Sequence, residues 1–82
     1  MEALDGNAIA GSLFEYFGVE MTTIRGTCAH CGASALVAEL VVYLCAPGAV
    51  ARCPSCGLVV IVAVEAPDHP RLDHAAFALA GR

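Results

Sequence analysis

Two short stretches decide this fold: Cys28-Ala29-His30-Cys31-Gly32 and Cys53-Pro54-Ser55-Cys56-Gly57. In each stretch two cysteines flank two residues and a glycine follows, and 21 residues (32–52) separate the two pairs. Two Cys-x-x-Cys pairs can place four thiolates at the corners of a tetrahedron around one metal ion, and this separation is just above the roughly 15–20 residues typical of such sites. The sequence therefore predicts a metal site, with zinc as its ion, made by Cys28, Cys31, Cys53 and Cys56.

The residues beside the cysteines suit tight turns. The residue after the second cysteine often needs positive φ, which glycine adopts at little steric cost, and Gly32 and Gly57 stand at these two positions. Pro54 fixes φ just after Cys53 and so favours closure of the second turn.

Size and composition predict a domain that needs a metal to hold it. The chain has 82 residues, of which 59% are hydrophobic and 15% charged. We expect a single small α+β domain over residues 1–82, with an antiparallel zinc-ribbon sheet, an N-terminal helix and a short C-terminal tail or helix, whose core is marginal at this size. Zinc binding by four thiolates contributes on the order of 10–16 kcal/mol coupled to folding, comparable with the whole stability of an ordinary domain.

Cysteine usage and hydropathy favour a cytoplasmic protein that is not in a membrane. Five cysteines are an odd count, and their paired spacing suits a metal better than disulfides, which indicates a reducing compartment. Glu2 and Asp5 stand where a signal peptide would carry positive charge. The longest apolar runs, residues 40–46 and 58–64, are far shorter than the roughly 18–20 residues that cross a bilayer.

The charge balance disfavours nucleic acid as a partner. The formal net charge is −4, and a zinc–tetrathiolate centre would make it two charges more negative. Nucleic-acid binding draws its affinity from clustered Lys and Arg, which displace counterions from phosphates. This chain has no lysine, and its four arginines are scattered at positions 25, 52, 71 and 82.

Residues 4–18 are predicted to form an amphipathic helix that Asp5 caps and Gly18 ends. One face of this helix is apolar: it carries Ile9, Leu13, Tyr16 and Phe17, with Phe14 at its edge. This face either packs on the sheet or is presented to a partner protein.

A zinc-binding sheet is predicted over residues 22–64. Residues 22–24 form a strand before the first turn, residues 33–45 a second strand, and residues 46–49 a turn into a third strand at 50–52. Alternate residues of a strand point to opposite faces, so residues 38–45 divide into two sets of side chains. The set expected in the core is Ala38, Leu40, Val42 and Leu44. The set expected on the opposite face is Glu39, Val41, Tyr43 and Cys45.

The strand expected at residues 58–65 is apolar on both faces from residue 58 to residue 64, which is typical of a central strand. A three-stranded ribbon and one helix cannot easily cover both faces, so we expect exposed apolar surface that binds a second copy of the chain or another protein. In the tail (65–82), residues 66–70 break the strand and residues 74–80 are predicted to form a short helix.

The two cysteine turns and the hairpin between them resemble a zinc ribbon over residues 22–64. More narrowly, residues 4–11 (Leu-Asp-Gly-Asn-Ala-Ile-Ala-Gly) and 39–48 (Glu-Leu-Val-Val-Tyr-Leu-Cys-Ala-Pro-Gly) are similar to a family of small actinobacterial proteins that has no established activity. This second resemblance implies a bacterial cytoplasmic protein in which a helix frames a ribbon.

Iron is the alternative metal. The pattern Cys-x-x-Cys-Gly followed by Cys-Pro-x-Cys-Gly also resembles the ligand turns of rubredoxins, small electron carriers, and Cys28, Cys31, Cys53 and Cys56 match those ligands one for one. Rubredoxins surround their iron with aromatic side chains and an acidic loop. This chain has no Trp and has a valine-rich hairpin between its cysteine pairs, which favours zinc.

The other titratable residues are assigned structural or solvent-exposed roles. Cys45 is expected to be a small buried hydrophobic residue, and His30 to face solvent within the first turn. His69 and His74, beside Asp68 and Asp73, could form a second, weak metal site or a catalytic pair, but a solvated tail is the favoured interpretation.

No catalytic arrangement is found in the sequence, and a four-cysteine site is closed, whereas a catalytic zinc keeps an open position. We therefore expect a non-enzymatic, structural zinc-ribbon protein that acts by binding another protein or a second copy of itself. A rubredoxin-like electron carrier is the second hypothesis, and a nucleic-acid-associated ribbon is the third.

Overall fold

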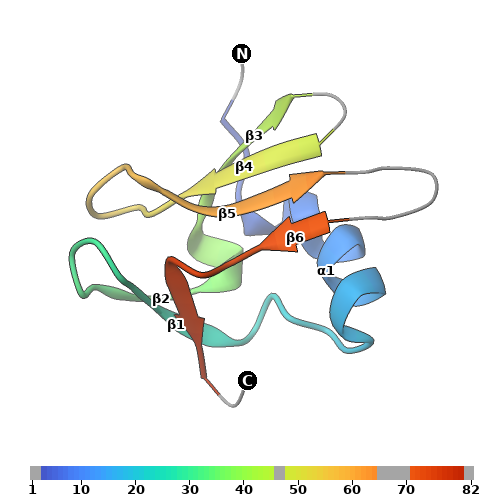
Figure 1. The fold of residues 1–82 in the computed structure, drawn as a ribbon, viewed down its shortest axis with the longest axis horizontal. Helices are drawn as coiled ribbons and strands as arrows, with labels where there is room; N and C mark the ends of the chain where they lie inside the picture. Colours follow the sequence, from blue (N-terminus) through green and yellow to red (C-terminus); the bar gives the residue numbers. More distant parts are fainter. Residues whose placement is uncertain (1–2, 46–47, 65–70, 81–82) are drawn as a thin grey trace.

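Two antiparallel sheets and an N-terminal helix make up the computed structural model, which describes residues 3–45, 48–64 and 71–80 (Figure 1). The first sheet has three strands in the order β2-β1-β7, and the second has four in the order β3-β4-β5-β6. Their bounds are Arg25–Cys28 (β1), Ser34–Leu36 (β2), Val41–Cys45 (β3), Gly48–Arg52 (β4), Val59–Val64 (β5), Arg71–Asp73 (β6) and Phe77–Leu79 (β7). The small α+β class is confirmed, but the single three-stranded ribbon is wrong.

The predicted N-terminal helix forms in two pieces. The Asp5 carboxylate accepts a hydrogen bond of 3.0 Å from the Asn7 N–H and caps a 3-10 helix, η1 (Gly6–Ile9), which leads into α1 (Ala10–Phe17). Gly18 ends α1 with φ at 76°, in the left-handed region that glycine favours. The predicted cap and stop are both confirmed.

Only part of the predicted apolar helix face is buried. Ile9 and Leu13 are almost fully buried, and Phe17 packs against the core. Phe14 and Tyr16 instead remain 53% and 50% exposed. The helix therefore supplies the core and also presents aromatic rings to solvent.

The continuous strand predicted over residues 33–45 is wrong, because the chain changes sheets within it. After β2 a 3-10 turn, η2 (Val37–Glu39), carries the chain from the first sheet to β3 of the second. The Glu39 carboxylate accepts a hydrogen bond of 2.6 Å from the Leu36 N–H, and the Val37 side chain is fully buried at this corner. Burial and local capping here override the strand propensity of the sequence.

Two further predictions are wrong at the ends of the sheets. Residues 22–24 form a turn rather than a strand, and β1 begins only at Arg25. Residues 74–80 form no helix. Instead β7 pairs with β1, with Gly26 opposite Leu79, and the Ala80 N–H donates to the Arg25 carbonyl at 2.9 Å. Pairing with a distant strand decides the structure of this tail, which local propensity cannot foresee.

The four-stranded sheet buries one face and leaves the other open. The register places Val42 opposite Ala51, and Ala51 opposite Ile61, and all three are nearly inaccessible in the same core as Ile9 and Leu13. The expected central position of β5 is confirmed, since it lies between β4 and β6.

Some predicted features fall elsewhere than expected or outside the described residues. Leu44, predicted to lie in the core, is 51% exposed near the end of edge strand β3. Residues 46–47 of the predicted turn and the strand break at 66–70 lie outside the described residues. In the part of the chain that the structure describes, no helix has the length and apolar character needed to span a membrane.

Packing around two N-terminal glycines gives a stability test. A Cβ at Gly6 would lie 1.7 Å from the Val37 carbonyl oxygen, whereas a Cβ at Gly11, within α1, would meet nothing within 4 Å. Gly6→Ala should therefore destabilise the metal-loaded protein by about 1–3 kcal/mol. Gly11→Ala should stabilise it by up to about 1 kcal/mol, because alanine is the better helix former. Chemical denaturation measures both variants, and equal effects would contradict this packing of η1 on η2.

Candidate metal centre

The structure brings the four predicted cysteines together at the junction of the two sheets. Cys28 ends β1 and Cys31 lies in the turn to β2, whereas Cys53 and Cys56 lie in the turn between β4 and β5. These two hairpin turns lie one above the other at the left of Figure 1. The four Sγ atoms all lie within 4.8 Å of one another. One ion bound here would therefore join the hairpin of one sheet to the hairpin of the other.

The two turns have the same backbone construction. In each turn the first cysteine takes part in three contacts. The backbone N–H two residues later points at the cysteine sulfur, and the N–H of the closing glycine donates to the cysteine carbonyl. The cysteine N–H donates to the carbonyl of the residue five positions later. The first turn has these contacts at 3.4, 2.8 and 2.9 Å, and the second at 3.4, 2.9 and 2.9 Å. Gly32 and Gly57 both have φ at 77°, so the predicted need for glycine is confirmed.

The sulfur geometry fits a tetrahedral thiolate site. A tetrahedron with metal–sulfur bonds of about 2.3 Å has sulfur–sulfur edges of about 3.8 Å. The Sγ atoms of Cys28 and Cys56 are 3.8 Å apart, and those of Cys31 and Cys53 are 3.7 Å apart. Four thiolates in this arrangement are typical of zinc or iron. The cluster could therefore hold such an ion without rearrangement of the fold.

The local environment shifts the pKa values of Cys53 and Cys31 in opposite directions. Hydrogen bonding from the Cys56 backbone lowers the pKa of Cys53 to about 6. The Ser55 backbone acts in the same direction, and desolvation acts against both. Although the Ala33 backbone acts in the opposite direction, desolvation and the three neighbouring thiols raise the pKa of Cys31 to about 12. Since only thiolates bind a metal, the cluster would release protons as it takes up an ion.

Two side-chain contacts that the sequence did not predict connect the turns to neighbouring residues, although His30 is exposed as expected. The His30 Nε2 atom lies 3.3 Å from the Val59 carbonyl oxygen, so the first turn reaches the beginning of β5. Arg52 donates from Nη1 to the Gly57 carbonyl at 2.9 Å and thereby closes the second turn across its base. Both contacts depend on how the hairpins are placed, and no local sequence signal could have identified them.

The remaining candidate residues that the structure describes lie outside the cluster. Cys45, expected to be buried, is exposed on β3, and its sulfur lies 4.0 Å from the Tyr43 carbonyl. The ring of His74 lies 5.4 Å from that of Phe17, in a tilted contact. Asp68 and His69 are outside the described residues. Within the described ranges, the four cysteines are the group of side chains found close enough to hold a metal.

Fold and site together define a small α+β domain with a zinc-ribbon-like cluster of four cysteines. The chain belongs to DUF6510, a family of unknown function, whose model matches residues 1–80. No curated protein and no solved structure matches the chain.

Serine substitutions test which cysteines bind the metal. Cys53→Ser should reduce the bound metal well below one ion per chain and unfold the protein, because a structural four-thiolate site supports folding directly. Cys45→Ser changes an exposed side chain outside the cluster, so it should keep its metal and lose less than about 0.5 kcal/mol of stability. Elemental analysis and denaturation measure both effects. Full occupancy in Cys53→Ser, or metal loss in Cys45→Ser, would contradict the assignment.

Proposed function

We propose that this protein is a structural zinc-binding module that acts by binding another protein. The observation that carries the proposal is the convergence of four cysteine sulfurs within 4.8 Å at the junction of the two sheets. Four protein ligands complete the coordination of zinc and leave no open position for a substrate or a water molecule. This closed arrangement supports a structural rather than an enzymatic role.

A rubredoxin-like iron carrier is the second candidate, and one observation favours it. Backbone N–H groups of His30 and Ser55 point at the sulfurs of Cys28 and Cys53, and such contacts tune the reduction potential of iron–thiolate centres. The ligand geometry alone suits both metals. Zinc is proposed first because the chain has no Trp and has a valine-rich hairpin between its cysteine pairs, unlike the aromatic surroundings of rubredoxin iron.

The metal itself decides between these two candidates. Freshly purified protein should be colourless and contain one zinc per chain by elemental analysis, because zinc has a filled d shell and no redox chemistry. A red protein with visible absorption bands and stoichiometric iron would instead establish the electron-carrier hypothesis.

The exposed apolar residues of the helix support a protein partner. Phe14, Tyr16 and Val19 are 53%, 50% and 39% exposed, and they lie on α1 and just after it. Aromatic residues are enriched where proteins bind one another, and two of these three exposed side chains are aromatic. Nucleic acid remains the less favoured partner, because binding to phosphates requires clustered basic residues and the arginines here are dispersed.

A cytoplasmic location is proposed from the paired free cysteines.

Adjacent residues of α1 allow a matched test of this surface. Phe14→Asp places a charge in solvent, so it should keep its zinc, change stability by about 0.5 kcal/mol or less and weaken association. Leu13→Asp places an unpaired charge in the core, so it should lose about 3–5 kcal/mol and release the metal.

Light scattering of the purified protein distinguishes the two kinds of partner. Concentration-dependent association that Phe14→Asp removes indicates a second copy, and a monomer at all concentrations leaves a different protein as the partner. Loss of zinc in Phe14→Asp would contradict the proposed surface, because it would place Phe14 among the residues that hold the fold.

A further inference from the structure

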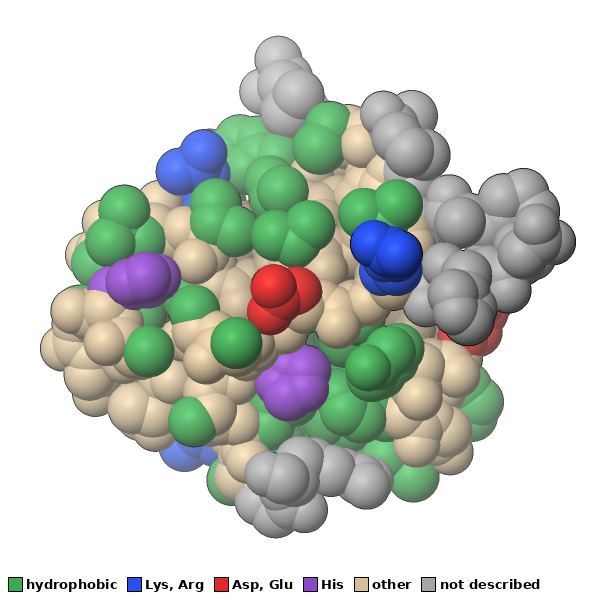
Figure 2. Space-filling model, in the orientation of Figure 1, with side chains coloured by type: hydrophobic (Ala, Val, Ile, Leu, Met, Phe, Trp, Pro, Cys, Tyr) green, Lys and Arg blue, Asp and Glu red, His purple; other side chains and the backbone are tan. Residues whose placement is uncertain are grey.

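The open face of the four-stranded sheet is apolar although nothing described covers it. Residues paired across the strands share a face, and the register places Tyr43 opposite Val50, and Val50 opposite Val62. These side chains are half-buried or exposed, whereas the opposite face of the same strands is in the core. Figure 2 shows hydrophobic side chains gathered over this sheet, with basic groups on either side of them.

Charge on the open face is opposite in sign to that of the whole chain. Arg52 on β4 and Arg71 on β6 belong to this face, because they pair with Val41 and Val64, and among the described residues of the sheet Asp73 is the acidic one that shares it. The chain as a whole carries a formal net charge of −4. The open face is therefore a place where an otherwise acidic protein can attract an anion.

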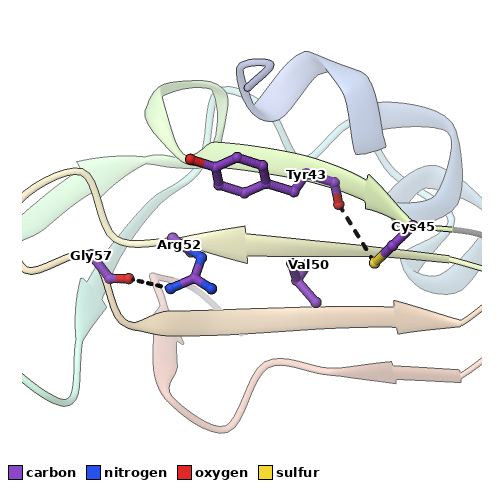
Figure 3. A pocket seen from close by; sticks show the side chains of 5 residues that line it. All are labelled: Tyr43, Cys45, Val50, Arg52 and Gly57. Carbon is purple, nitrogen blue, oxygen red and sulfur yellow. Dashed lines mark hydrogen bonds between the residues drawn. The ribbon is translucent and has the colours of Figure 1, made fainter. Parts of the chain in front are cut away.

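A groove of about 570 Å³ lies on this face between β3 and the second cysteine turn (Figure 3). Its lining is Tyr43, Cys45, Val50, Arg52 and Gly57. The Tyr43 ring lies beside the Arg52 guanidinium at one end of the groove, the Cys45 thiol lies at the other end, and Val50 lies between them (Figure 3). Small-molecule sites have volumes of about 300–1,000 Å³ and combine mainly apolar walls with a few polar groups, as this groove does.

Arg52 is held in place while most of its donors stay available. One N–H donates to the Gly57 carbonyl at 2.9 Å, and the guanidinium carbon lies 5.7 Å from the centroid of the Tyr43 ring. Arginine has five N–H donors, and among the described residues no carboxylate pairs with this one. A guanidinium fixed by a carbonyl and an aromatic ring is prepared to bind a carboxylate with little loss of rotamer freedom.

We propose that this groove binds a small organic carboxylate with a compact apolar body. The carboxylate accepts hydrogen bonds from the free N–H groups of Arg52, and the apolar body packs on Tyr43 and Val50. A second copy of the chain fits this face less well, because two arginines and one aspartate on each copy leave guanidinium groups without partners. The groove lies beside the cysteine turn, and ligand binding there does not depend on which metal the turns hold.

Amide chemical shifts of the metal-loaded protein, titrated with 4-tert-butylbenzoate, test the proposal. Saturable shifts should centre on the five residues that line the groove. The uncharged 4-tert-butylbenzamide has nearly the same shape, and it should bind about tenfold more weakly because it lacks the charge-assisted hydrogen bonds. Arg52→Met should remove this difference between the acid and the amide.

Two variants separate ligand binding from support of the turn. Val50→Trp fills the groove without touching the Arg52–Gly57 hydrogen bond, so it should abolish binding and keep the metal. Arg71→Met removes a cation from the same face but from outside the groove, so it should keep the affinity for the benzoate within about twofold. If Arg52→Met releases the metal, Val50→Trp still decides the outcome.

Three results would each overturn the proposal. The first is equal affinity for the acid and the amide. The second is a set of chemical-shift changes that centres on α1 or persists in Val50→Trp. The third is no saturable change by about 10 mM 4-tert-butylbenzoate, because an affinity that low is weaker than that of a specific small-molecule site. Occlusion of the groove by a second copy, seen as ligand-insensitive dimers in light scattering, would also overturn it.

Discussion

The convergence of four sulfur atoms at the junction of two hairpins is the constraint on which the rest of this fold depends. One hairpin belongs to the three-stranded sheet and the other to the four-stranded sheet, so the cysteine cluster joins two units that also share a hydrophobic core. An 82-residue chain has a small core, so a metal link can contribute a large part of its stability. A bound ion adds a strong link where the sheets meet, and both turns have the backbone geometry that aims their sulfurs at one point.

This construction leaves unusual freedom on the outside of the molecule. Because an ion bound at the cluster would contribute much of the stability, α1 can use Ile9 and Leu13 for the core and still present Phe14 and Tyr16 to solvent. The four-stranded sheet likewise buries one face and keeps an apolar, arginine-bearing face open. We infer that the centre is structural and that the exposed surfaces carry the binding functions. Arg52 connects the two, because its side chain closes the second turn and also lines the groove.

The sequence predicts the local features well and the long-range pairing poorly. The cysteine turns, the Asp5 cap and the Gly18 stop follow from short-range rules of spacing and φ preference, and the structure has all three. The strand β7 was beyond those rules, because its pairing with β1 joins segments some fifty residues apart. Valine-rich alternation likewise hid the η2 corner, where burial of Val37 outweighs strand propensity. The exposed position of Cys45 agrees with the alternation over residues 38–45, whereas its expected burial rested on the general preference of free cysteines for the interior.

Metal removal tests the central claim most directly, namely that the cluster holds both sheets in one fold. Two-dimensional amide spectra would be recorded before and after a chelator is added to reduced protein. If the claim is right, dispersed signals vanish together from both sheets and from α1, and return when zinc is restored. A metal-free protein that keeps its dispersed signals outside the two cysteine turns would contradict the claim, since packing alone would then maintain the fold.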